Sequence, residues 1–158
     1  MKDALGRLDE WTDVKDRWSS VEEGVQRVYR RSRRAFTAVT QTPTVEHLHE
    51  WRKQARYFRH QLELLRALKP GVLGPLTHKT DRLGELLGDD HDLAMLPREV
   101  AGDPERFGGA QTITPLLGRI DQRREKLEHQ AVALGREVFK PAPDDFVRRL
   151  HTYWKDWH

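Results

Sequence analysis

Apolar residues recur three and four positions apart over long stretches of this sequence, and most proline and glycine residues fall between those stretches. Such spacing places apolar side chains on one face of an α-helix, whereas a half-buried strand needs strict alternation of apolar and polar residues. We find no internal repeat and no low-complexity tract. The pattern therefore predicts an all-α fold, an antiparallel bundle of four main helices and a short C-terminal helix.

Capping residues and helix breakers set the bounds of the predicted helices. Residues 20–23 have the spelling of a capping box, Ser-Val-Glu-Glu, which predicts a helix start there. Pro70 stops the second helix, and Pro75 and Pro97 are places where the third could start late or end early. The predicted helices cover about residues 21–39, 44–69, 72–100, 114–139 and 144–157, with a loop over 101–109.

The 158 residues suffice for one compact domain, with residues 1–18 as a weakly defined N-terminal segment and residues 19–158 as the helical bundle. The chain has no cysteine, which excludes a disulfide framework, a thiolate metal site and a cysteine nucleophile. No apolar run approaches the roughly 18 residues that a membrane-crossing helix needs. The first residues also lack the apolar core of a signal peptide. We therefore expect a soluble cytoplasmic protein that does not enter membranes.

Positive charge is concentrated in one segment, although the whole chain carries a formal net charge of only +3. Residues 24–69 contain 11 Arg and Lys against 3 Glu, a net charge of +8, while the remainder contains 17 basic and 22 acidic residues, a net charge of −5. Such clustering is typical of a protein with an anionic partner, and guanidinium groups match phosphate oxygens in pairs. A solvated helix face is the alternative.

Basic residues share one face of the predicted 44–69 helix, within about 120° of each other at 100° per residue. We call them the basic row: His49, Arg52, Lys53, Arg56, Arg59 and His60. The opposite face is expected to meet the core and carries Trp51, Phe58, Leu62 and Leu65. From His49 to Arg59 the row is about 15 Å long, which suits an elongated polyanion better than a single phosphate.

The preceding helix repeats this separation of charge and core. Its cationic face, which we call the arginine row, carries Arg27, Arg30, Arg31 and Arg34. Val25, Tyr29 and Phe36 lie on the opposite face. Because helices joined by a short turn pack antiparallel, the two rows can line one groove if both helices present them on the same side. The alternative, two rows that merely face water, stays open.

Polar residues interrupt the apolar stripe of the predicted 72–100 helix. Lys79 and Asp90 fall within this stripe, and His91 lies at its edge. A charged residue in a core-facing row is costly unless it is paired or turned into a wet cavity. We expect Lys79 to reach the anion and Asp90 or Asp92 to orient a basic side chain. For His91, a satisfied polar residue at the helix margin is the alternative.

Three segments resemble the CHAD family of histidine-containing α-helical domains. They are YRRSRR at 29–34, HEWRKQARYFR at 49–59 and LLGDDHDL at 86–93. His49, Arg52, Arg56 and Arg59 fall on the family's H-x2-R-x3-K-x2-R pattern, with Arg56 where lysine is more usual, a departure that keeps the charge. The resemblance covers about residues 19–157.

The resemblance implies a helical domain that binds inorganic polyphosphate through basic side chains, is associated with polyphosphate granules and often accompanies triphosphate-processing domains. The implied polyphosphate contacts are Arg30, Arg34, His49, Arg52, Lys53, Arg56, Arg59 and Lys79. The helix geometry adds supporting residues: Arg27, Arg31, Asp90, His91 and Asp92. A complete family domain is about twice this length and has two facing helical halves. The chain therefore resembles the C-terminal half, completed by self-association or by an N-terminal half.

Four other functions compete with polyphosphate binding, one of them a granule-surface or scaffold protein that makes contacts through its aromatic-rich tail at residues 153–157, although that tail is more readily expected to pack on the bundle. An enzyme is disfavoured because the chain has no phosphate-loop, dinucleotide-loop or helical His-Glu-x2-His motif, so we expect no catalytic residue and no cofactor. A metal site is disfavoured because no two of the eight His stand three or four positions apart. Nucleic acid presents the same phosphates, but Tyr29, Trp51 and Phe58 fall on core faces, where they cannot stack on bases. Nucleic-acid binding stays open as the main alternative.

Overall fold

The computed structural model describes residues 17–157, which fold into helices and connecting turns. The α-helices are α2 (Trp18–Gln41), α3 (Val45–Leu65), α4 (Pro70–Gly102), α5 (Ala110–Val138) and α6 (Pro143–Trp157). Two short 3₁₀ helices, η2 (Arg66–Leu68) and η3 (Glu105–Phe107), lie in the connections. The predicted all-α class is confirmed. Of the predicted N-terminal segment, residues 1–16 lie outside the described part of the chain.

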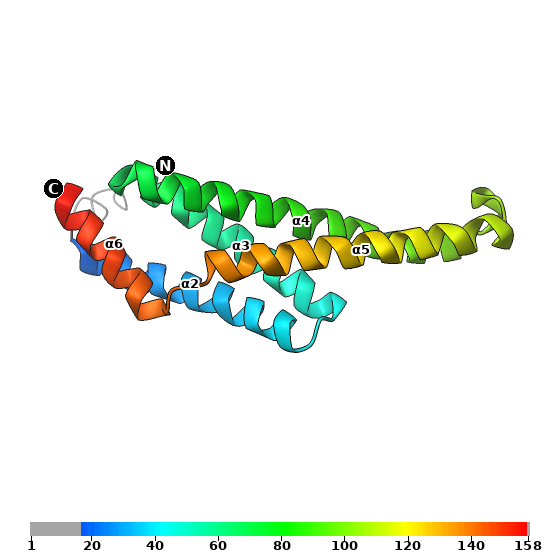
Figure 1. The fold of residues 1–158 in the computed structure, drawn as a ribbon, viewed down its shortest axis with the longest axis horizontal. Coiled ribbons are helices and arrows are strands. Elements are labelled where there is room, and N and C mark those ends of the chain that lie inside the picture. Colours follow the sequence, from blue (N-terminus) through cyan, green and yellow to red (C-terminus); the bar gives the residue numbers. More distant parts are fainter. Residues whose placement is uncertain (1–16, 158) are drawn as a thin grey trace, which may run out of the picture.

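Helices that are neighbours along the chain pack against each other. α3 contacts both α2 and α4, α5 runs along α4, and α6 returns to α2 (Figure 1). The outer halves of α4 and α5 extend past α2 and α3 as a two-helix arm (Figure 1). The antiparallel bundle of four main helices stays a prediction in its exact arrangement, and it did not include the arm.

The core at the junction of α2, α3 and α6 is aromatic. The Tyr29 ring stacks on Phe146 with ring centroids 4.1 Å apart, and Phe58 meets Tyr29 edge-on at 5.3 Å. Trp51 is fully buried and lies 5.2 Å from Phe36, centroid to centroid. The predicted core faces of α2 and α3 are confirmed by the burial of Val25, Tyr29, Trp51, Phe58, Leu62 and Leu65.

The start of α2 differs from its prediction. The helix begins at Trp18, and its N-cap Arg17 makes no side-chain capping hydrogen bond, so the predicted capping box of Ser20 and Glu23 is wrong. Trp18 is only 6% exposed and stacks on the His151 ring of α6 at 5.5 Å. This tertiary contact extends the helix beyond the local capping signal, because burying a large aromatic ring outweighs one capping bond.

Prolines do not interrupt α4. Pro70 occupies the first helical turn, where no backbone N–H is needed, and the helix continues through Pro75 and Pro97 to Gly102. An internal proline costs about 3 kcal/mol in an isolated helix. Here the loss is offset by packing on both sides of each proline, since Leu73, Leu83 and Val100 are buried. The late start and early end considered for this helix are therefore wrong.

The remaining helix bounds lie close to their predictions. The helix predicted to start near residue 44 starts at Val45, and Thr44 caps it, its side chain accepting a hydrogen bond from the backbone N–H of His47. α5 begins four residues earlier than predicted, after Gly108 (φ 85°) and Gly109 (φ 74°) turn the chain with left-handed backbone angles that favour glycine. Within residues 17–157, every helix is too short or too polar to cross a lipid bilayer.

Candidate functional site

The arginine row lies exposed along α2. Its four members, with Glu23 and Gln26, line a shallow depression of about 410 Å³. Arg30 donates to Asp144 of α6 at 2.8 Å in an ion pair whose two side chains are more than half exposed. Arg27, Arg31 and Arg34 have no ion-pair partner within the described residues. Three of the four guanidinium groups are thus available to an external anion.

A second depression, of about 430 Å³, lies between α2 and α3. Arg31 and Arg34 line it from α2, and Glu50 and Gln54 line it from α3. The Glu50 carboxylate pairs with Lys53 at 2.5 Å and accepts from Gln54 at 2.7 Å. These hydrogen bonds, that from Lys53 foremost, hold the pKa of Glu50 below its usual value. Glu50 therefore remains an anion beside the arginine row.

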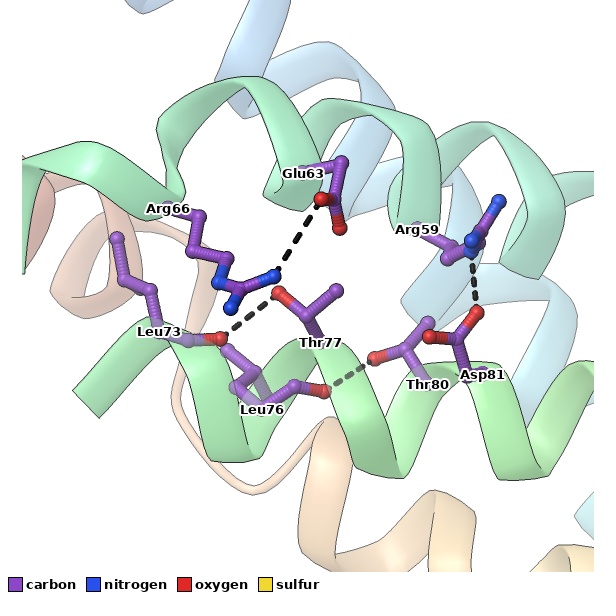
Figure 2. A network of polar contacts seen from close by, with 8 residues as sticks. All are labelled: Arg59, Glu63, Arg66, Leu73, Leu76, Thr77, Thr80 and Asp81. Carbon is purple, nitrogen blue, oxygen red and sulfur yellow. Dashed lines mark hydrogen bonds and ion pairs between the residues drawn. The ribbon is translucent and has the colours of Figure 1, made fainter. Parts of the chain in front are cut away.

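The basic row faces a different depression. Arg52, Arg56 and Arg59 line a groove of about 300 Å³ between α3 and α4, which we call the α3–α4 groove. Its other lining residues are Ala55 from α3 and Thr80, Asp81, Gly84 and Glu85 from α4. The Nε of Arg59 donates to the Asp81 carboxylate across this groove (Figure 2). Arg52 and Arg56 have no ion-pair partner within residues 17–157.

The two rows do not share one groove. The arginine row lines depressions on α2 and between α2 and α3, whereas the arginines of the basic row line the α3–α4 groove. The physical reason is the width of a helix: the face of α3 toward α2 carries Glu50 and Gln54, and the face toward α4 carries Arg52 and Arg59. An elongated polyanion would have to cross α3 to contact both rows.

Two histidines from different helices meet beyond the end of the α3–α4 groove. The rings of His49 on α3 and His91 on α4 have centroids 5.1 Å apart and planes tilted by 40°. Arg52 follows His49 by one turn, and its Nε is 3.9 Å from the point where a Cβ on Gly88 would lie. The structure thus joins His91, a supporting residue in the prediction, to the basic row.

The other predicted residues of α4 lie elsewhere. Lys79 is exposed and pairs with Glu137 of α5 at 2.7 Å, so its predicted place in an inward row is wrong. On a helix Lys79 points about 140° away from Gly84, which lines the groove. Asp90 is buried and binds Arg124 of α5 at 2.9 Å, so it does orient a basic side chain, but one in the α4–α5 interface. Asp92 is exposed.

Sequence reasoning overlooked two features of this surface. One is the α4 wall of the α3–α4 groove, formed by Thr80 and Asp81 and, four residues later, by Gly84 and Glu85; this one-turn spacing was the available signal. The other is Tyr57, which is 49% exposed and directly follows Arg56. Its angle of about 80° from His49 on the helical wheel already placed it off the core face.

Among the described residues, no three His, Asp or Glu are grouped to hold a metal ion.

Comparison with models of protein families gives a match. The model of the CHAD domain matches residues 1–101. The chain belongs to the CHAD family. The match includes α2, α3 and nearly all of α4, and therefore both rows and the α3–α4 groove, whereas the resemblance noted in the sequence was placed over about residues 19–157. Comparisons with curated proteins and with solved structures found no match.

Proposed function

We propose that this CHAD domain binds inorganic polyphosphate without covalent chemistry and without catalysis, in the cytoplasm and on polyphosphate granules. The observation that supports the proposal is a set of arginines without a carboxylate partner within residues 17–157: Arg27, Arg31, Arg34, Arg52 and Arg56. Protein surfaces normally intersperse acids among bases, so unpartnered guanidinium groups in rows point to an anion from outside.

Binding would rest on repeated, charge-assisted hydrogen bonds. Each guanidinium group offers paired N–H donors that fit two oxygens of one phosphate. Arg52 and Arg59 are seven residues apart, about 10.5 Å along the helix axis, so one extended chain can contact both. His49 adds a ring nitrogen as a hydrogen-bond donor at one end of the row. This arrangement resembles that of other CHAD domains, which bind polyphosphate through basic side chains.

Calorimetric titration with long-chain polyphosphate at physiological salt tests the proposal. The variant Arg52→Ala/Arg56→Ala/Arg59→Ala removes the groove's cations, and we expect its affinity to fall at least about tenfold. Arg98→Ala/Arg106→Ala/Arg119→Ala removes the same charge from the arm and should change affinity by about threefold or less. Equal losses in the two variants would contradict a specific site and indicate general electrostatic attraction.

We also propose that a second helical half faces the rows, supplied by self-association or by an N-terminal half. The support is that the arginine row is exposed along α2 and the basic row is at least partly exposed beside the α3–α4 groove, where a facing half could enclose the ligand. Sedimentation analysis with and without polyphosphate tests this arrangement. We expect a dimer when polyphosphate is bound, and a monomeric complex of full affinity would contradict self-association.

Nucleic acid is the second candidate ligand, because of one side chain. Tyr57 is 49% exposed beside Arg56, and an exposed aromatic ring among cations is the usual platform for stacking an unpaired base. Replacing Tyr57 by Ala distinguishes the two ligands. If bases stack there, single-stranded DNA loses about 1–3 kcal/mol of binding free energy and polyphosphate loses none. If the parent protein and Tyr57→Ala bound DNA equally well, the support for nucleic-acid binding would be lost.

A further inference from the structure

We propose that two residues of α4, Gly84 and Asp81, determine which polyanion enters the α3–α4 groove. Gly84 keeps the groove wide enough for a phosphate chain, and Asp81 occupies Arg59 until a sufficiently dense anion displaces it. The inference rests on the proposed function, because it explains how a polyphosphate site would reject other polyanions.

The floor of the groove is made of small residues. Ala55 from α3 and Thr80 and Gly84 from α4 lie between the arginines of one wall and the carboxylates of the other. The Thr80 hydroxyl donates to the carbonyl of Leu76 in its own helix at 2.9 Å, as Figure 2 shows, so its hydrogen is already used. The floor therefore contributes room rather than hydrogen-bond donors, and recognition falls to the arginines.

Protein packing alone does not require glycine at position 84. A Cβ added to Gly84 would meet no atom within 4 Å, whereas one on Gly135 of α5 would lie 2.7 Å from Phe36 and Trp51. Glycine inside a helix costs stability relative to alanine. At Gly135 the close approach of the core requires it. At Gly84 the open space belongs to a groove lined by arginines, so a side chain there would occupy room that a ligand can use.

Asp81 is an internal competitor for the ligand. Its carboxylate binds the Nε of Arg59, and the two side chains are 38% and 39% exposed. A carboxylate offers a guanidinium group the same kind of oxygen acceptors as a phosphate does, so only one of the two anions can bind this arginine fully. Arg52 and Arg56, which lack such a partner in the described chain, are free to bind first.

This arrangement favours inorganic polyphosphate over nucleic acid. In polyphosphate a single oxygen joins successive phosphates, whereas nucleic acid places a sugar, which also carries a base, between them. The inorganic chain is therefore narrower and carries its charges closer together. A narrow chain fits a groove floored by Gly84, and closely spaced charges compete better with Asp81 for Arg59.

Gly84→Leu tests the width of the groove, with Gly118→Leu as its control. Gly118 lies in the arm, and a Cβ there also meets no atom within 4 Å. Both changes replace a helical glycine with a strong helix former, so both proteins should melt at the same or a higher temperature than the parent. We expect only Gly84→Leu to lose polyphosphate affinity, by about tenfold. Unchanged affinity in a folded Gly84→Leu protein would overturn the proposed role of Gly84.

Asp81→Asn tests the competition, with Glu137→Gln as its control. Each change removes one negative charge from an ion pair, but Glu137 binds Lys79 on the other side of α4. We expect Asp81→Asn to raise polyphosphate affinity about threefold and to raise affinity for single-stranded DNA more, while Glu137→Gln changes neither by that much. Equal effects of the two changes would overturn the role of Asp81.

The failure of this inference differs from a failure of the proposed function. If the parent protein does not bind polyphosphate, the proposed function is wrong and the inference is wrong with it. If the parent binds and the arginine variants lose binding, but Gly84→Leu and Asp81→Asn behave like their controls, only the inference is wrong.

Discussion

Asp90 and Arg124 form an ion pair inside the α4–α5 interface. The Asp90 side chain is 3% exposed and that of Arg124 is 19% exposed, and Arg124 also reaches Glu128 at 3.4 Å. Desolvation makes such a pair a weak source of stability, but either ion is very costly when left without the other. The pair also sets the register of the two helices, because Asp90 of α4 must lie opposite Arg124 of α5. Polar residues in the core of a coiled coil set register in the same way.

Removing one partner of this pair should therefore destabilise the domain strongly. We expect Asp90→Ala to lower the free energy of unfolding by about 3 kcal/mol, because the partly buried Arg124 then loses its closer carboxylate and keeps only the 3.4 Å contact with Glu128. The double change Asp90→Leu/Arg124→Leu should recover most of that loss. Urea denaturation followed by circular dichroism measures both values. A loss below about 0.5 kcal/mol in Asp90→Ala would show that water replaces the carboxylate freely.

Glu128 makes stability depend on pH. Burial, followed by the negative charge of Asp90, raises the pKa of Glu128 above its usual value. A carboxyl with a raised pKa in the folded state binds its proton more tightly there than in the unfolded chain. Its contribution to stability is thus fully present below the unfolded pKa and is lost as pH rises through the folded pKa.

Replacing Glu128 by Gln tests this dependence. We expect the parent protein to lose stability from this group as the pH rises from its ordinary pKa, 4.5, to above the raised value, and Glu128→Gln to lack that component. Chemical denaturation of both proteins at several pH values in this window gives the difference. Parallel stability curves for the two proteins would contradict the assignment.

At the scale of whole helices, α5 approaches α2 and α3 closely at a glycine, which has no side chain. Gly135 allows α5 to lie against Phe36 and Trp51, since an added Cβ would be 2.7 Å from both rings. The helical pattern of the sequence predicted that these helices form, and Thr44 as the start of α3, because those signals are local. It did not predict the start of α2 or the continuity of α4 through its prolines. Packing against other helices decided both.

Adding one methyl group at Gly135 should separate these elements. We expect Gly135→Ala to lower the free energy of unfolding by about 2 kcal/mol, since overpacking a tight core outweighs the gain in helix propensity. Gly118→Ala, where a Cβ meets nothing, should instead raise stability by up to about 1 kcal/mol. Thermal unfolding of both variants distinguishes packing from propensity. A stabilised Gly135→Ala would contradict the close approach.

The molecule as a whole combines a packed body with a projecting arm. The body holds the aromatic core, whereas in the arm, as far as residues 17–157 show, α4 and α5 pack along each other and on no further helix (Figure 1). Val100 and Ile120 are buried there, but Met95, Leu96 and Leu116 remain between 38% and 42% exposed. Each arm helix also contains a proline, Pro97 or Pro115. Fewer apolar contacts and missing backbone hydrogen bonds give the arm a lower local stability.

Hydrogen exchange should therefore divide the chain in two. We expect backbone amides of residues 97–116 to exchange through local opening, at least about tenfold faster than amides around Tyr29 and Trp51, which require global unfolding. Exchange measured by mass spectrometry on peptides from both regions gives the comparison. Equal protection in the two regions would show that the arm unfolds together with the body.

The sequence by itself determined the helices, their core faces, the two cationic rows and the membership of the CHAD family. The helices, core faces and rows depend on residue spacing within one helix, and 3.6 residues per turn translates spacing into faces directly. The family membership depends on motifs in three successive helices, which can also be read along the chain. Only the tertiary structure decided that Arg59 meets Asp81, that His49 meets His91, that Lys79 turns toward Glu137 and that the two rows line separate depressions. Each of these contacts joins two helices. Their relative rotation and register are set by packing of the whole core, which no single stretch of sequence encodes.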